Sequence, residues 1–99
     1  MSSYQRYLTE DRRLVILRVL AGVPGYSANS SILGDVLERY AHQPSRDQIH
    51  GDLAWLADQD LVTVEAVGSV HVATLTQRGL DVSQGRSHCP GVKQPGPGV

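Results

Sequence analysis

The sequence is nearly devoid of cysteine, since Cys89 is the only one in 99 residues. A single thiol has no partner within the chain, which excludes a disulfide framework and a metal site built from the cysteines of one copy. Apolar runs long enough to span a bilayer are also missing, and the first residues lack the apolar centre of a secretory signal. We therefore expect a cytoplasmic protein that has no membrane partner.

Charge of one sign is not in excess either. Nine basic and ten acidic side chains give a net charge of -1 and a pI near 6.4. This balance argues against a protein whose whole surface binds a polyanion, although it leaves room for a local basic patch. Residues 82–99 contain Arg86 and Lys93 but no acidic residue, so the end of the chain is its basic part.

Clusters typical of metal sites or catalysis are absent from the sequence. The histidines fall in a predicted loop, helix, strand and tail, at positions 42, 50, 71 and 88, without short ligand spacing. We interpret them as solvated or hydrogen-bonded side chains. Cys89 lies in a predicted flexible tail without an adjacent base, which makes it a poor nucleophile. The sequence therefore predicts no enzyme, no cofactor and no metal.

The first predicted helix begins at Thr9 as its N-cap and ends at Gly22. Its leucines at helical spacing form one buried face, but Val15 and Val19 point away from that face. A helix that is apolar on more than one side either lies centrally in the core or contributes to a subunit interface. The second alternative predicts a homodimer. The residues predicted at its interface are Tyr4, Tyr7, Val15 and Val19.

Two more helices are predicted from apolar spacing and caps. Asn29 or Ser30 can cap the second, and Pro44 lies beyond its end. Ser45 and Gln48 form the S-x-x-Q pattern of a capping box, which marks the start of the third helix. Its buried stripe consists of Ile49, Leu53 and Leu56, and its outward side of Asp47, His50, Gly51, Ala54 and Asp58.

A β-hairpin and a short last helix complete the predicted elements. Valines alternate over residues 62–72 around a turn at Gly68 and Ser69. Thr76 can cap the last helix. The segment that follows is rich in Pro and Gly and has almost nothing to bury, which predicts disorder or an extended arm. The predicted organisation is a domain over residues 1–84 and a disordered Pro/Gly-rich basic tail over residues 85–99.

This order of elements resembles that of winged helix domains. The stretch "LAWLADQDLVTVE" resembles the L-x-x-L-x-x-x-G-L-V signature of bacterial regulators of the arsenic-repressor and multiple-antibiotic-resistance type, through Leu53, Leu56, Leu61 and Val62. Asp60 replaces the usual glycine, and Asp tolerates the left-handed conformation better than most residues. The resemblance implies a mainly α fold with a small β-hairpin (α+β): a winged helix-turn-helix with three helices, a two-stranded wing and a short C-terminal helix.

The stretches "YQRYLTEDRRLVILRVL", "SRDQIHGDLAWLADQDLV" and "ATLTQRGLDV" are also similar to small proteins of Mu-like phages and prophages. This similarity implies a phage protein that acts in the cytoplasm of a bacterial host cell. Metal-sensing members of the arsenic-repressor family carry cysteines on the third helix. This helix has none, so the resemblance does not extend to metal sensing.

The resemblance also implies that the third helix reads DNA, because exposed residues at the start of a recognition helix contact base edges in the major groove. Arg46 suits guanine, Gln48 suits adenine and Asp47 suits cytosine. The alternative is a solvated first turn with a cap, since Asp47 repels phosphates and the wing turn carries no Arg or Lys. The predicted DNA-binding residues are Ser45, Arg46, Asp47, Gln48, His50, Arg39 and Ser69.

Two functions are compatible with these features. The first is a phage or prophage transcriptional regulator that binds double-stranded DNA as a homodimer. The second is a winged helix protein–protein interaction module, such as a phage packaging or assembly accessory factor, whose partner is a phage protein. The acidic balance of residues 1–81 and the aspartates on the outward side of the third helix favour the second.

Overall fold

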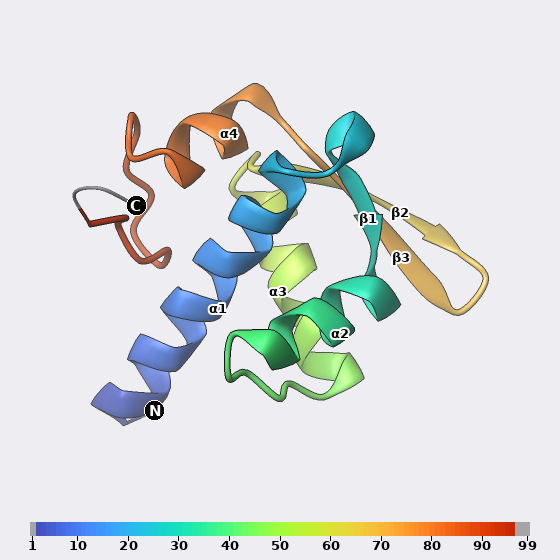
Figure 1. Cartoon of the computed structure of the whole chain (residues 1–99), viewed down its shortest axis with the longest axis horizontal. Coiled ribbons are helices and arrows are strands. Elements are labelled where there is room, and N and C mark those ends of the chain that lie inside the picture. Colours follow the sequence, from blue (N-terminus) through green and yellow to red (C-terminus); the bar gives the residue numbers. More distant parts are fainter. Residues whose placement is uncertain (1, 97–99) are drawn as a thin grey trace.

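Four helices and a three-stranded antiparallel sheet make up the part of the chain that the structure describes, residues 2–96, in the computed structural model (Figure 1). The predicted α+β class is confirmed, as is the order of three helices, a hairpin and a closing helix. None of the helices within these residues is long and apolar enough to cross a membrane. The elements are α1 (Ser3–Ala21), the 3-10 turn η1 (Pro24–Tyr26), β1 (Ser27–Asn29), α2 (Ser30–Arg39), α3 (Arg46–Asp58), β2 (Val62–Val67), β3 (Val70–Leu75) and α4 (Gln77–Ser83).

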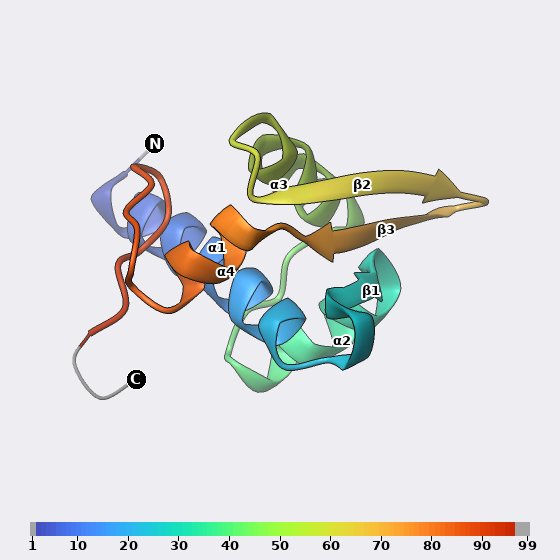
Figure 2. The ribbon, with the colours of Figure 1, turned by 90° about the horizontal axis from the view of Figure 1, so that it is seen from above.

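The strands β2 and β3 form the predicted hairpin. The sheet has the order β1-β3-β2, and Val67 pairs with Val70 next to the two-residue turn. Gly68 opens this turn with a positive φ of 59°, which glycine adopts without steric cost. The hairpin projects beyond α1 and α4, with its turn at the opposite end of the molecule from the chain termini (Figure 2).

The short strand β1 was not predicted. It pairs antiparallel with β3, with Ser27 opposite Thr74 and Asn29 opposite Val72. The hydroxyl groups of Ser27 and Thr74 are also hydrogen-bonded at 3.0 Å. The sequence "SAN" shows no apolar alternation, so this strand exists because β3 pairs with it and not because of its local pattern.

The first helix begins earlier than predicted. Ser2 is its N-cap, and its side chain and that of Gln5 form a capping box. The prediction of Thr9 as the N-cap is therefore wrong. The missed signal is the S-x-x-Q pattern of residues 2–5, the same one that marks the start of the third helix. The predicted end is confirmed, since Gly22 is the C-cap.

The other predicted caps are confirmed. The side chain of Asn29 accepts a hydrogen bond at the start of α2, and that of Thr76 does so at the start of α4. Ser45 and Gln48 form the predicted capping box of α3. These side chains satisfy backbone N–H groups that have no partner within the helix, so they fix where each helix starts.

The end of α3 turns directly into β2 through a left-handed residue. Asp60 has a φ of 62°, as predicted for the position where a glycine is usual. The N–H of Leu61 donates to the carbonyl of Leu56 at 3.0 Å, and the N–H of Asp60 donates to that of Ala57 at 3.0 Å. These two bonds form a Schellman motif, which ends the helix and reverses the chain toward the sheet.

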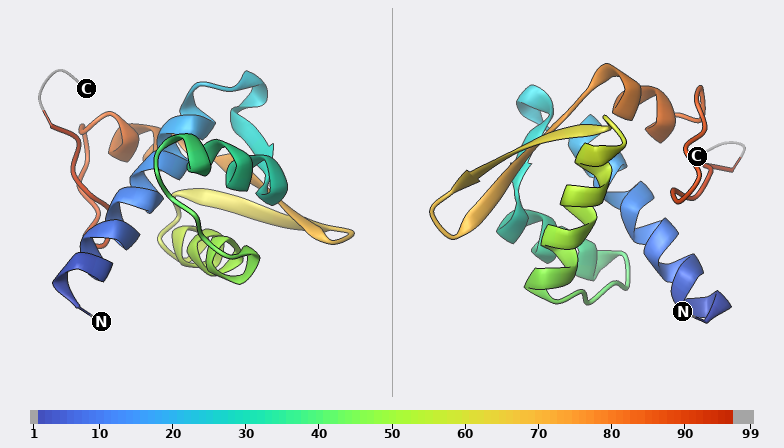
Figure 3. Two further views of the ribbon diagram at one scale, coloured as in Figure 1. Left: turned by 60° about the horizontal axis from the view of Figure 1, so that its bottom comes forward. Right: turned by 180° about the vertical axis from the view of Figure 1, so that it is seen from behind.

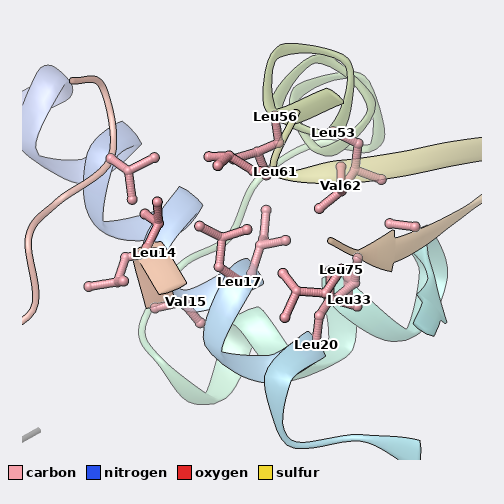
Figure 4. Packing of buried hydrophobic residues seen from close by; sticks show 14 of the residues in the cluster. Leu14, Val15, Leu17, Leu20, Leu33, Leu53, Leu56, Leu61, Val62 and Leu75 are labelled. Atoms are coloured by element: carbon pink, nitrogen blue, oxygen red, sulfur yellow. The ribbon is translucent and has the colours of Figure 1, made fainter. Parts of the chain in front are cut away.

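The core lies around α1, which is central to the molecule (Figure 4). Its buried side chains face leucines of α2 and α3 and residues of the sheet. Among them is Val15, which is only 7% exposed, while Val19 is partly buried against the core. The prediction that Val15 lies on an uncovered face for a second copy is wrong, because α4 packs against α1. The other alternative, a position of this face in the core, holds for Val15.

The segment after α4 is packed along α1 and is not an arm (Figures 1 and 3). Cys89 and Val92 are 1% and 3% exposed and belong to the core. Gly91, with a φ of 100°, forms a turn between these two buried residues. The prediction that this segment buries almost nothing is therefore wrong for residues 85–96. The last residues of the predicted tail, 97–99, lie outside the described residues.

Candidate functional site

The starts of α2 and α3 and the turn of the hairpin converge on one surface. Figure 3 shows α3 lying beside the hairpin, with α2 next to the start of α3. A cavity of about 290 Å³ lies between the three elements. It is lined by Ser30, Ser31, Gly34, Arg46, Ile49, Ser69 and Val70. We call this the α3–hairpin surface.

Arg46 joins α3 to the hairpin. One Nη atom of its guanidinium donates a hydrogen bond to the carbonyl oxygen of Ser69 in the hairpin turn. The side chain is otherwise exposed, as expected for the first turn of α3. Two residues of the predicted DNA-binding set that are far apart in sequence are thus brought together. The bond also fixes the position of the positive charge relative to the hairpin.

His50 stacks on His71 of β3. The two rings are 3.8 Å apart between centroids and inclined by 13°. The Nε2 atom of His50 lies 3.2 Å from the hydroxyl of Ser30, and the same hydroxyl accepts the backbone N–H of His71 at 3.0 Å. The prediction that His50 points outward is wrong, because the hairpin covers this flank of the helix and leaves the ring half-buried.

The environment of His50 disfavours its charged form. Burial lowers the pKa of His50 below its ordinary 6.5, and the charges of His71 and Arg46 lower it further. The carboxylate of Asp47 acts in the opposite direction but does not outweigh them. The His50 ring therefore takes up a proton at a lower pH than a free histidine does.

The remaining predicted DNA-binding residues lie at two places. Asp47 is exposed on the first turn of α3. The Oε1 atom of Gln48 accepts the N–H of Ser45 at 2.8 Å, so the capping box occupies this side-chain oxygen. Arg39 is exposed at the opposite end of α2 from Ser30 and does not line the cavity. The structure therefore groups all of the predicted residues except Arg39 near the start of α3.

Exposed carboxylates outnumber exposed cations on these elements. Within α2, α3 and the hairpin strands, the exposed basic side chains are Arg39 and Arg46. The exposed acidic side chains there are Asp35, Glu38, Asp47, Asp58 and Glu65. The electrostatic attraction of this part of the molecule to a polyanion is therefore limited to a few contacts.

Two further arginines, Arg12 and Arg13, are used inside the protein. Both bond the carboxylate of Asp52, which is 4% exposed. The Nε atom of Arg13 lies 3.3 Å from the Oδ1 atom of Asp52. Arg13 also lies over the ring of Trp55 at 3.9 Å and donates to the carbonyl of Gly91 at 3.1 Å. The network ties α1, α3 and the final segment together. The charges of Arg12 and Arg13 are therefore paired within the protein.

Sequence reasoning missed Asp52 although a signal was present. Asp52 follows Ile49 by three residues and directly precedes Leu53, so it lies on the buried stripe of α3. A carboxylate at such a position requires a cationic partner, because an unpaired buried charge is costly. The adjacent arginines of α1 are the partners that the fold supplies.

A second ionic cluster fastens the final segment to α1. Asp11 bonds the Nε2 atom of the buried His42 at 2.7 Å and the Nζ atom of Lys93 at 3.3 Å. The backbone N–H of Lys93 donates to the carbonyl of Glu10 at 3.2 Å. Partial burial raises the pKa of Asp11, but hydrogen bonds and charge from His42 and Lys93 outweigh it and bring the pKa below 3.8.

Two residues of the predicted dimer interface, Tyr4 and Tyr7, lie on the first turns of α1. Tyr4 and Tyr7 are 70% and 68% exposed. Tyr7 also lines a cleft of about 710 Å³ between α1 and the final segment. With Val15 in the core, the exposed part of the predicted interface is confined to these two tyrosines and the accessible side of Val19.

Residues 2–96 contain no group of three His, Cys, Asp or Glu side chains placed to hold a metal ion. The fold and the surface thus define a small α+β protein whose exposed helix start and projecting hairpin form one surface.

Comparison with known proteins gives the family. The chain is 54% identical over 90 residues to the uncharacterized protein gp26 of Escherichia phage Mu, covering 91% of this chain and 93% of that protein. It is 45% identical over 82 residues to an uncharacterized protein of Haemophilus influenzae, covering 82% of this chain and 79% of that protein. The chain belongs to the family of the phage Mu protein gp26, so the predicted similarity to Mu-like phage proteins is confirmed. No protein-family model matches the chain.

Proposed function

We propose that the chain is a winged helix DNA-binding protein that acts as a phage or prophage transcriptional regulator in the cytoplasm of the host cell. In this proposal α3 is the recognition helix and the β2–β3 hairpin is the wing. The observation that carries it is the bond between Arg46 and the hairpin turn at Ser69. This bond makes the start of α3 and the hairpin one surface, with an arginine where a recognition helix meets base edges.

Base recognition would rest on the first turn of α3. Arg46 keeps guanidinium nitrogens beyond the one bonded to Ser69, and these suit the acceptors of guanine. Asp47 is exposed and suits the amino group of cytosine. Gln48 would read adenine with both amide atoms only after leaving the capping box, because its Oε1 is occupied there. Arg46 is therefore the main specific contact in this proposal.

The limited positive charge predicts a weak dependence of binding on salt. If Arg39 and Arg46 each neutralise one phosphate, the logarithm of the affinity would fall with the logarithm of salt concentration with a slope of about -2 for each bound copy. Fluorescence anisotropy of a labelled generic duplex at rising salt measures this slope. Micromolar binding at low salt with this slope supports the proposal, and absence of binding at low salt contradicts it.

A homodimer belongs to the proposal because a dimer would place two copies of α3 on neighbouring half-sites of the DNA. The exposed Tyr4 and Tyr7 on the first turns of α1 are its candidate contacts. Sedimentation at high micromolar concentration tests this part separately. A protein that stays monomeric there has no such interface.

A second candidate is a module that binds a phage protein in packaging or assembly. The exposed carboxylates of α2, α3 and the hairpin favour it, since a basic protein surface would match them. The two candidates differ in the effect of Asp58→Lys. This substitution would strengthen DNA binding by adding a cation, whereas it would weaken the binding of a basic protein partner.

A further inference from the structure

We propose that His50, His71 and Ser30 form a proton-sensitive joint that fastens the hairpin to α2 and α3 and opens on acidification. The proposal does not depend on DNA binding, because it concerns the position of the hairpin in the free protein. It rests on the stacking of the two rings and on the shared hydroxyl group.

The joint connects three elements through one hydroxyl. Ser30 is 5% exposed at the start of α2, and its Oγ atom bonds both the ring of His50 on α3 and the backbone N–H of His71 on β3. The parallel rings add a stacked contact between α3 and β3 at 3.8 Å. Every bond of this joint therefore crosses from the hairpin to a helix or from one helix to the other.

Within residues 2–96, no strand covers this side of β3 at His71. The pairing of β1 with β3 ends at Val72, so His71 lies beyond the last residue that β1 covers. On its other side His71 pairs with Ala66 of β2, which carries no charge. The bond from Arg46 to the carbonyl of Ser69 also links the turn to α3. Loss of the joint would leave the hairpin held near its turn by that bond.

Protonation acts on the joint through repulsion. A proton on the His50 ring places a positive charge against the ring of His71, 3.8 Å away between centroids, and near the guanidinium of Arg46. Asp47 is the acidic group that faces them and opposes this effect. From α2 the joint receives only the uncharged hydroxyl of Ser30. The burial that lowers the pKa of His50 is relieved when the ring moves into water, so protonation favours the open joint.

The backbone N–H of His71 reports the state of the joint directly. It donates to Ser30 and not to a neighbouring strand, so its protection from hydrogen exchange depends on this bond. We expect its protection factor, normalised for the intrinsic exchange rate at each pH, to fall about tenfold between about pH 7.5 and about pH 5.0. Amide groups within the core of α1 should keep their protection over the same range.

Two variants separate the joint from general effects of acid. His50→Phe keeps an aromatic ring but takes up no proton, and it should remove most of the pH dependence at His71. His88→Gln removes an exposed histidine of the final segment and should leave that dependence unchanged. If His50→Phe does not fold, the wild-type titration alone decides. A constant protection factor at His71 in the wild type would overturn the proposal, as would a fall of equal size in a folded His50→Phe.

Discussion

Gly79 of α4 lies directly against the carbonyl oxygen of Leu61. A Cβ atom added at Gly79 would be 2.1 Å from that oxygen and 2.6 Å from the side chain of Leu75. The same carbonyl accepts the N–H of Thr76 at 3.1 Å, so it cannot move without loss of this bond. The close approach of α4 to the junction between α3 and β2 therefore requires a glycine, although glycine weakens a helix.

Gly79→Ala should lower the free energy of unfolding by about 1 to 3 kcal/mol or more, because the backbone must shift to admit the methyl group. Urea denaturation followed by circular dichroism measures this change. Gly51→Ala is the matched control, since Gly51 is exposed on α3 with nothing within 4 Å of an added Cβ. It should raise stability by about 0.5 to 1 kcal/mol. Equal effects of the two substitutions would contradict the packing of α4.

Asp52→Ala should destabilise the protein by about 3 to 5 kcal/mol, because it leaves the guanidinium groups of Arg12 and Arg13 without their buried partner. Thermal unfolding of the variant measures the loss. Asp58→Ala removes a carboxylate from an exposed position of the same helix and should change stability by less than about 0.5 kcal/mol. A similar small effect at Asp52 would show that the arginines do not depend on it.

Asp11 should make stability depend on pH in the acid range. Its pKa is lowered from 3.8 in the folded protein, so its stabilising contribution is present above pH 3.8 and is lost as the pH falls through the lower folded value. Asp11→Asn should reduce this acid dependence, which urea midpoints at neutral and at acid pH measure. Asp35→Asn removes a carboxylate from an exposed position and serves as the control. Identical acid dependence in the wild type and Asp11→Asn would refute the role of the cluster with His42 and Lys93.

Arg46→Ala should weaken DNA binding by about 1 to 3 kcal/mol if Arg46 contacts a base. Arg46→Lys keeps the charge but not the planar fork, so it should retain non-specific binding and lose discrimination between sequences. Arg78→Ala, on the exposed side of α4, is the control and should leave affinity unchanged. Anisotropy with duplexes selected from a random pool provides the measurement. Equal affinity of the wild type and Arg46→Ala would exclude the first turn of α3 from the DNA contact.

Local sequence signals were sufficient to predict the caps and turns that residues close in sequence form. The box of Ser45 and Gln48, the caps at Asn29 and Thr76 and the turn at Gly68 involve residues at most three positions apart, and the structure has each of them. Asp60 adopts the left-handed conformation that the junction of α3 and β2 requires. Such features follow from backbone geometry and hydrogen bonding within one turn, so a sequence reveals them.

Features that depend on distant partners were missed or misplaced. The predicted outward position of His50 is wrong because a helical projection contains no hairpin. The same projection contains no α4, so it leaves open whether Val15 lies in the core or at a subunit interface. The burial of Cys89 and Val92 depends on a turn at Gly91 that lies against Trp55.

The sequence by itself determined the starts of α2, α3 and α4, the hairpin turn, the buried stripe of α3 and the similarity to Mu-like phage proteins. Only the tertiary structure decided that Arg12 and Arg13 serve Asp52, that Arg46 reaches Ser69 and that the final segment is part of the core. The physical reason is that periodicity and capping act over a few residues, whereas burial and ion pairing are set by residues that folding brings together from separate elements.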